Sequence, residues 1–432
     1  MIKIQNLDLR SYAVISLLAL WASTTFSIAL MEISFVCALV LWIGWRIQLR
    51  EKDQSVTSPT PEVQYGGRQI KPRGLLGVDW ALWAPLALFF IFVLASFFTS
   101  EYPKQSLRGL FKIAKPLLVF IMAADLFRGD KPMNRFDVIF LVTFLMVTID
   151  SSIQYAFGKD LLRGFTAEHS SAGIRLVGPF GNFAKMSTYL VLVIPVFAMR
   201  FWNDFTRSES RKKAFYALAL ALAGFILLYL TRCRGPVLAL ALALGILFIY
   251  KRWFITLGVS LLLGLTVLVT MVPRHVLIHR DAEGKEQSIV ERFELWKRAL
   301  DVIEAKPLTG TGINTYSVAH QRYDKEQNWR VRNYYAHNGY LQLAAEIGLP
   351  GIFCFLGFLF MFFRRSLQAI RRARGSPEEY PMLGILTGLL AFLIYAAFDN
   401  NLQSPPSLMF FWFLAGVLMA NQNSQKPSNE KA

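Results

Sequence analysis

Charged side chains are scarce in this sequence and are unevenly spread along it. Asp, Glu, Lys and Arg make up 17% of the 432 residues, against about 25% in an average soluble domain. Hydrophobic residues make up 54%, and they gather in runs close to the roughly 20 residues that cross a bilayer core. Lipid cannot hydrogen-bond the backbone, so such runs are helical. These features exclude a soluble globular protein and predict an all-α integral membrane protein.

Cysteine is nearly absent, and several motifs of metal and nucleotide chemistry are missing. Cys37, Cys233 and Cys354 lie far apart in or beside apolar runs, so we predict packing roles and no disulfide framework. The sequence has no D-x-D, no H-E-x-x-H and no G-x4-G-K-[ST] phosphate loop. His275 and His279 have i,i+4 spacing but lack a third ligand, and we interpret them as interfacial. We therefore expect no metal and no other cofactor.

Acidic residues are outnumbered by basic ones, 29 to 46, which gives a formal net charge of +17. A basic balance of this size can indicate a nucleic-acid partner. The chain contains no soluble basic domain with interleaved aromatic residues, however, so we expect no nucleic-acid binding. The basic loops of a membrane protein account for most of the charge.

Twelve apolar runs are candidates for membrane spans. The first leads almost directly into the second and lacks a small-residue cleavage site, so we interpret it as a retained span and not as a signal peptide. The predicted spans are residues 11–29, 31–45, 78–98, 108–127, 136–157, 183–202, 214–231, 236–250, 254–272, 338–363, 381–398 and 406–420.

The distribution of Lys and Arg predicts the topology. With both termini in the cytoplasm, the inside segments hold 24 Lys and Arg and the short outside loops hold 6, as the positive-inside rule requires. Residues 273–337 form one long outside segment with 11 Lys and Arg, and long segments translocate regardless of charge. The predicted organisation is nine spans in 1–272, a large periplasmic loop at 273–337, three spans in 338–420 and a cytoplasmic tail at 421–432.

The long loop contains a predicted helix over residues 288–304, which ends before Pro307 and a Gly-rich turn at 309–312. Its apolar residues recur at three to four positions and predict one apolar face. We expect this face to lie on the membrane or to roof a cavity. The face consists of Phe293, Trp296, Leu300 and Ile303.

Basic residues in the outside loops are the first candidates for chemistry. Arg232 and Arg234 lie in a very short hairpin between two apolar runs, where an arginine is costly unless it is paired or faces a polar cavity. Arg234 either reaches lipid phosphates or binds a diphosphate ligand with its planar fork. Arg175 lies in a glycine-containing loop that either approaches a ligand closely or is an ordinary surface loop.

Three further ionisable residues lie at or inside the predicted membrane. His337 precedes the tenth span and is either an interfacial packing residue or a general base, since an unperturbed histidine pKa near 6.5 suits that role. Asp150 and Lys185 lie in the outer halves of the fifth and sixth spans. Ionisable groups in a membrane are candidates for function, and a structural ion pair between these two is the alternative.

Four motifs occur in a fixed order after residue 290. They are R-x3-W-x2-A from Arg292, P-L-T-G-T-G from Pro307, H-N-G-Y-L-Q from His337 and E-I-G-L-P-G from Glu346. In this order they resemble the O-antigen ligase and polymerase superfamily. The resemblance extends over roughly residues 170–355, and the twelve-span layout fits the whole chain.

Two arginine motifs add to the resemblance. The stretch 231–235 is similar to the S-R-G motif of the family, with Cys233 at the position of the usual small hydroxyl residue. Arg175, in R-x2-G-x-F-x-N, resembles the arginine motif of an earlier outside loop. That motif usually continues N-P-N, whereas here Asn182 is followed by Phe183.

The resemblance implies a membrane glycosyltransferase with a GT-C-like architecture and a polyprenyl-diphosphate-linked glycan donor. One large outside loop favours the O-antigen ligase branch. This enzyme transfers O-polysaccharide from undecaprenyl diphosphate to lipid A–core, on the periplasmic side of a Gram-negative inner membrane. O-antigen polymerase and protein O-oligosaccharyltransferase are the alternatives within the superfamily. A twelve-span transporter is the alternative outside it, although no inverted repeat is visible.

The resemblance also implies roles for individual residues in a metal-independent, inverting transfer. His337 is expected to be the general base, and Arg175, Arg234 and Arg232 are expected to bind the donor diphosphate. The supporting residues implied are Asn338, Arg292, Lys185 and Asp150.

Overall fold

The structure is a computed structural model. It describes residues 8–55, 63–65, 68–70, 80–128, 130–170, 173–207, 210–256, 258, 262, 264, 266, 287–323 and 335–424. Eleven of the twelve predicted spans coincide with a helix in this part of the chain, and the prediction for 254–272 falls mostly outside it. The all-α membrane architecture is confirmed, because nine of the described helices are long and apolar enough to cross a membrane.

The helices that coincide with predicted spans are α1 (Leu9–Phe26), α2 (Ile28–Ser55), α3 (Trp80–Phe98), α4 (Pro103–Leu126), α5 (Asp130–Phe157), α6 (Phe183–Arg207), α7 (Arg211–Leu230), α8 (Arg234–Lys251), α13 (Gly339–Arg372), α14 (Glu379–Ala396) and α15 (Pro405–Ser424). Two of them, α4 and α15, are not among the nine apolar helices. Basic side chains interrupt α4, and the apolar part of α15 is shorter, at Pro405–Asn421.

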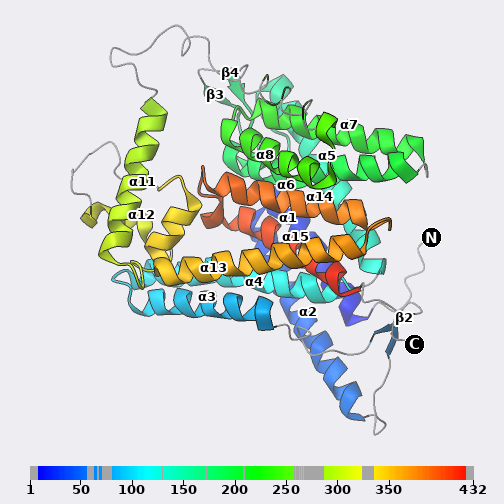
Figure 1. Ribbon diagram of the computed structural model, residues 1–432, viewed down its shortest axis with the longest axis horizontal. Helices are drawn as coiled ribbons and strands as arrows, with labels where there is room; N and C mark the ends of the chain where they lie inside the picture. Colours follow the sequence, from blue (N-terminus) through cyan, green and yellow to red (C-terminus); the bar gives the residue numbers. More distant parts are fainter. Residues whose placement is uncertain are drawn as a thin grey trace.

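The remaining elements are short or lie outside the predicted spans. They are the helices α11 (Gln287–Ala305) and α12 (Tyr316–Ala319), the single turns η1 (Gly178–Phe180), η2 (His320–Tyr323) and η4 (Asn401–Gln403), and two antiparallel hairpins, β1 (Val63–Tyr65) with β2 (Arg68–Ile70) and β3 (Glu168–Ser170) with β4 (Gly173–Arg175). Figure 1 shows α11 and α12 together at one end of the helical bundle. We call this the loop end, since α4, α6, α8 and α13 also begin there.

The centre of the bundle is built on a close contact between α6 and α14. A Cβ atom at Gly388 would lie 2.4 Å from the carbonyl oxygen of Leu192, and one at Gly384 would lie 2.8 Å from Cα of Val196. Only glycine permits this approach, and small residues four apart are a common device for packing membrane helices. The contact fixes α14, and with it the α14–α15 connection, relative to the start of α6 (Figure 1).

The limits of the loop helix were predicted well, and its predicted apolar face is partly packed. Helix α11 extends over Gln287–Ala305, close to the predicted 288–304. Of the predicted face, Ile303 is buried, whereas Phe293 and Leu300 are 61% and 54% exposed. The other buried side chains of the helix include Leu295, Ala299 and Val302. Helix α11 therefore has apolar residues on two sides, and contact of the exposed ones with the membrane stays a prediction.

The glycines of two motifs fit against each other where α13 is interrupted. Gly348 has φ +78°, and a Cβ atom there would lie 2.2 Å from the carbonyl oxygen of Leu308. Gly310, with φ +66°, approaches the backbone of Glu346 equally closely. The backbone N–H groups of Thr311 and Gly312 then donate to Ala345 and Glu346, which compensates for the interrupted helix. The two motifs are thus one structural unit.

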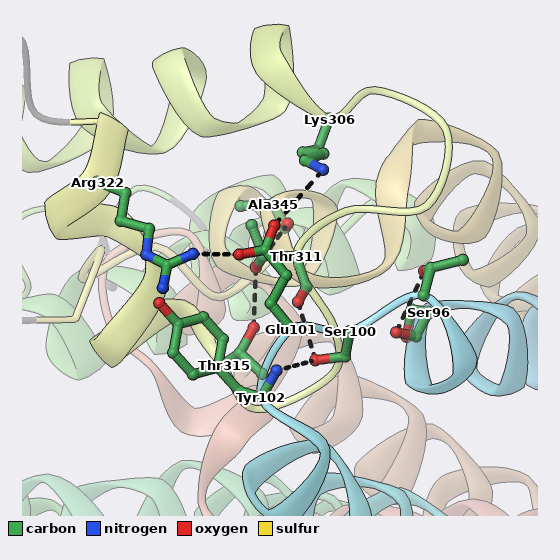
Figure 2. Close-up of polar contacts among 10 residues, drawn as sticks. Ser96, Ser100, Glu101, Tyr102, Lys306, Thr311, Thr315, Arg322 and Ala345 are labelled. Atoms are coloured by element: carbon green, nitrogen blue, oxygen red, sulfur yellow. Dashed lines mark hydrogen bonds and ion pairs between the residues drawn. The ribbon is translucent and has the colours of Figure 1, made fainter.

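This unit is fastened to the α3–α4 connection (Figure 2). The Ser100 hydroxyl donates to the carbonyl oxygen of Thr311 at 3.1 Å and accepts from the N–H of Tyr102. The Glu101 carboxylate forms ion pairs with Arg322 and with Lys306. Segments that are about 200 residues apart are therefore held together at the loop end.

Candidate functional site

His337 lies at the loop end immediately before α13, in a left-handed backbone conformation with φ +47°. Its Nδ1 atom is 3.6 Å from Oδ1 of Asp399, and the ring is 37% exposed. The next residue, Asn338, is the N-cap of α13, since its side chain accepts from the N–H groups of Tyr340 and Leu341 at 3.1 Å each. Asn338 therefore fixes the position of His337 through the backbone.

Asp399, in the α14–α15 connection, is a site residue that the sequence did not reveal. Its Oδ2 atom accepts from the hydroxyl of Tyr395 at 2.5 Å, and its carbonyl oxygen accepts from the N–H of Gly339 at 3.1 Å. Burial opposes ionisation, but His337, Tyr395 and the N–H of Asn400 outweigh it and hold the pKa of Asp399 below its usual range. The carboxylate is thus ionised at neutral pH. The available signal was an acidic residue in a short outside loop without Lys or Arg.

The α7–α8 hairpin and the loop before α6 meet beside this pair. The N–H of Leu176 donates to the carbonyl oxygen of Leu230 at 3.0 Å. Nη2 of Arg175 lies 3.5 Å from the carbonyl oxygen of Arg232. Arg232 has φ +53°, which turns the chain sharply into α8, and Arg234 is the first residue of that helix. Three predicted arginines therefore converge on one hairpin.

Cys233 joins the arginine loops to the His337–Asp399 pair. Its sulfur is 3.8 Å from the hydroxyl of Tyr395. Burial, and then the Asp399 carboxylate, raise the pKa of the Cys233 thiol to about 11, while the charges of Arg175 and Arg292 act in the opposite direction. The thiol is therefore neutral and unsuited to nucleophilic attack. Both arginines lie within electrostatic reach of the same point.

Two guanidinium groups of this cluster stack on aromatic rings. Arg175 stacks on the ring of Phe183, with 4.0 Å from Cζ to the ring centroid, and Arg232 stacks on Tyr229 at 4.5 Å. Nε of each of the two arginines is buried without a hydrogen-bond partner in the described part of the chain. Aromatic rings orient a guanidinium without neutralising it, so the cluster presents positive charge that an anion can compensate.

Helix α8 adds to the positive potential of the cluster. Its N-cap, Cys233, makes no side-chain hydrogen bond to the first turn, so backbone N–H groups there are left to other acceptors. A helix N-terminus favours anions through these groups and through the helix dipole. The half-buried Arg234 occupies the first position of the same turn. The arrangement is suited to a phosphate or diphosphate group.

Asp150 and Lys185 do not join the cluster through any hydrogen bond or ion pair in the described residues. Oδ1 of Asp150 accepts from the N–H groups of Leu161 and Leu162 at 2.9 Å each, which folds the chain after α5. The alternative ion pair between Asp150 and Lys185 does not form. Arg292 is exposed on α11.

Metal binding has no support within the described residues, where no group of three or more His, Cys, Asp and Glu side chains could hold an ion. His275 and His279 lie outside these residues. The positive cluster itself is unsuited to a cation, because Arg175, Arg232 and Arg234 would repel it.

Comparison with known proteins gives one match. Residues 217–356 match the family model described as O-antigen ligase. The matched segment contains Arg232, Arg234, Arg292 and His337, while Arg175 and Asp399 lie outside it. No curated protein matches the chain.

Proposed function

From membership of the O-antigen ligase superfamily, which this match supports, we propose that the protein is an O-antigen ligase that transfers O-polysaccharide from undecaprenyl diphosphate to lipid A–core. The superfamily handles O-antigen, and the chain is a multi-pass, glycosyltransferase-like membrane protein. One observation carries the finer proposal: the arginine loops and the His337–Asp399 pair meet at the same end of the bundle, joined through Cys233 and Tyr395.

The arginines bind and stabilise the diphosphate of the donor. Arg175 and Arg232 are held by aromatic rings, their Nε atoms have no hydrogen-bond partner in the described part of the chain, and Arg234 is the first residue of α8 beside them. A guanidinium donates two parallel hydrogen bonds to phosphate oxygens. As the bond between sugar and diphosphate breaks, negative charge grows on the leaving diphosphate, and fixed cations stabilise that charge most strongly in the transition state.

His337 takes the proton from the acceptor. With Asp399 facing Nδ1, the neutral ring carries its proton on Nδ1 and leaves Nε2 free to accept another. Nε2 removes the proton of an acceptor hydroxyl, whose oxygen attacks the anomeric carbon of the donor sugar. The bond from that carbon to the diphosphate breaks on the opposite face, so the configuration inverts. The Asp399 carboxylate stabilises the protonated ring and is a positioning residue.

We place the loop end in the periplasm and both termini in the cytoplasm, on the inner membrane. The support is the excess of Lys and Arg in the segments at the opposite end. Single cysteines at Leu308, exposed at the loop end, and at Glu378, exposed at the opposite end, test this placement. An impermeant maleimide added to intact spheroplasts should label the first and not the second, and the reverse pattern contradicts the proposal.

Complementation tests the activity itself. In a Gram-negative strain that lacks its own O-antigen ligase, expression of this chain should restore polymer on lipid A–core. The His337→Ala variant, checked for equal abundance in the membrane, is the control and should leave the polymer on undecaprenyl diphosphate. Lengthening of the lipid-linked polymer without transfer to lipid A–core would instead identify a polymerase.

A further inference from the structure

Helix α4 carries four basic side chains on one face of its half nearest the loop end. Lys104, Arg108, Lys112 and Lys115 follow one another at spacings of four, four and three residues. At about 100° per residue, all four lie within about 80° of the helix circumference. We call this row the basic stripe. None of its members belongs to the arginine cluster of the candidate site, and the fold does not require such a row in an apolar bundle.

The basic stripe follows a seam between lipid-facing surface and protein. On one flank of α4, Leu107 and Phe111 are 45% and 56% exposed, as expected for side chains in contact with acyl chains. On the other flank, Gly109 packs so closely on Ile313 and Asn314 that a Cβ atom would lie 2.6 Å from Cβ of Asn314. The stripe is therefore reached from the membrane and borders the segment before α12.

The two deeper members of the stripe have partners. Nζ of Lys115 is 2.6 Å from Oε1 of Glu32 on α2. Nζ of Lys112 donates to Oδ1 of Asn314 at 2.7 Å and lies within electrostatic reach of the buried Glu346. Leu30, beside Glu32, is 47% exposed, so the Lys115–Glu32 pair borders the lipid-facing surface. Lys115 lies within the predicted span 108–127, where a charge requires such a partner.

The two outer members have none. Lys104 and Arg108 are exposed and make neither a hydrogen bond nor an ion pair within the described residues. Lys104 lies eleven residues before Lys115, or about 16 Å nearer the loop end along the helix. Lys104 precedes the predicted span 108–127 and Arg108 is its first residue, so both are at the level of lipid headgroups.

A cavity connects the stripe with the start of α13. It is small and open on one side, and Lys112, Asn314, Glu346 and Gln403 provide its polar lining. The side chain of Gln403 donates to the carbonyl oxygen of Gly339, two residues after His337. On its other side, the first turn of α13 contacts α14, where the Tyr340 hydroxyl donates to the carbonyl oxygen of Leu393. The start of α13 thus lies between the cavity and the His337–Asp399 side.

We propose that the basic stripe binds the phosphate groups of a lipid in the membrane leaflet at the loop end, with its acyl chains on Leu107 and Phe111. Lys104 and Arg108 provide the main contacts, and Lys112 extends them toward the cavity. Taking the proposed function as given, this lipid is the acceptor, lipid A–core. Donor diphosphate and acceptor phosphates then occupy separate cationic surfaces on either side of the first turn of α13, and His337 lies between them.

Direct lipid binding tests the site without any transfer reaction. The full-length protein is placed in phosphatidylcholine nanodiscs, and diphosphoryl lipid A is titrated and quantified by native mass spectrometry. The Lys104→Gln/Arg108→Gln double variant should bind it about thirtyfold more weakly, since each of the two basic residues contributes about 1 kcal/mol to anionic lipid binding near a membrane surface, and about 1.4 kcal/mol corresponds to a factor of ten. Dephosphorylated lipid A should not distinguish the two proteins. Equal binding of diphosphoryl lipid A overturns the proposal.

Two further variants serve as controls. The first tests whether the effect depends on the number of charges removed, and the second tests whether substitution at these two positions disrupts folding. Lys212→Gln/Lys213→Gln removes two exposed charges at the opposite end of the bundle and should bind like wild type. Lys104→Arg/Arg108→Lys keeps both charges and should also retain binding, whereas loss in this variant contradicts a simple phosphate contact. Inorganic pyrophosphate at millimolar concentration should not displace the lipid, and displacement would indicate a site for free phosphate instead.

Transfer kinetics then separate this proposal from the proposed function. In a reconstituted assay, the Lys104→Gln/Arg108→Gln variant should raise the KM for acceptor on the order of tenfold, with kcat and the KM for donor unchanged. If the wild-type protein transfers no glycan, the ligase assignment fails. The nanodisc titration still measures lipid binding in that case, so the two proposals can be told apart. If wild type transfers and the double variant has an unchanged acceptor KM, the stripe does not bind the acceptor.

Discussion

The arginines of the candidate site have different neighbours from the basic residues at the opposite end of the bundle. At the end opposite the loop end, arginine and lysine meet carboxylates. Arg46 is 2.6 Å from Asp125, Arg200 is 2.7 Å from Asp137, and Lys251 is 2.5 Å from Glu379. At the loop end, Arg175 and Arg232 meet aromatic rings and a carbonyl oxygen.

The difference distinguishes charged groups that stabilise the fold from charged groups that, in our proposal, bind a ligand. A buried ion pair whose partners satisfy each other holds two elements in place but has little capacity to attract a third charge. Arg46 shows this, since both oxygens of Asp125 are engaged by Arg46 and one also accepts from Trp42. An arginine held by a ring keeps its positive potential. Substitutions at the two ends should therefore affect activity and stability in opposite proportion.

The largest loss of activity is expected for His337→Ala. Removal of the general base should lower the transfer rate about 10²–10⁴-fold, while binding of the lipid-linked donor persists because the arginines remain. Turnover and donor binding are measured on the same purified protein. Near-wild-type transfer would show that His337 is an interfacial packing residue.

Arg234→Lys should be next, with a loss on the order of 10²-fold in turnover and weaker donor binding. A lysine retains the charge but cannot reproduce the planar fork of hydrogen-bond donors. The matched control is Arg200→Lys at the opposite end, which should keep both properties. If the two variants behave alike, the distinction between structural and ligand-binding arginines is lost.

Asp399→Asn should slow transfer about tenfold, because the amide no longer stabilises the protonated ring of His337. A structural role alone would not alter the pH profile. The variant replaces a carboxylate whose pKa is held below its usual range by His337 and Tyr395 with an amide that does not titrate, so the dependence of the rate on pH should change. An unchanged profile would remove Asp399 from the mechanism.

Asp125→Asn should lower stability more than activity. It leaves Arg46 without its buried partner, and breaking such a pair costs about 3–5 kcal/mol, so the melting temperature should fall clearly. Activity per folded molecule should change less than twofold, since Asp125 lies at the end away from the site. Selective loss of activity without loss of stability would contradict the comparison.

Chelation should have the smallest effect. In our proposal the positive cluster stabilises the diphosphate, as a metal ion does in other enzymes, so transfer should continue in EDTA at the wild-type rate. We also expect that adding Mg²⁺ or Mn²⁺ does not raise the transfer rate. Loss of activity in EDTA that either ion reverses would show that the arginines do not suffice.

The sequence predicted the positions of the helices well, because the length of an apolar run has few alternatives in a bilayer. It predicted less about which residues meet. The packed residues of α11 were only partly predicted, since Ile303 is buried but Phe293 and Leu300, which are equally apolar, are exposed. Asp399 was missed because its partner, His337, is 62 residues away in the chain, and a single sequence carries no signal for such a pairing.

The sequence motifs contain two kinds of residue: those that shape the backbone and those that are candidates for chemistry. Gly310 and Gly348, each in a different motif, are explained by a close backbone contact and not by chemistry. Asn338, adjacent to His337, is a helix cap. Pattern alone could not separate these structural positions from Arg234 and His337, because both kinds lie at the same end of the bundle and within the same motifs.

The order of the site residues along the chain has a consequence for biosynthesis. Ribosomes add about 5–20 residues per second, so Arg234 is synthesised roughly ten seconds or more before Asp399. The nascent chain therefore exposes its cationic loops before the carboxylate that faces His337 exists. Under the proposed mechanism, we expect transfer to begin only after the α14–α15 connection has formed and Gly388 lies against α6.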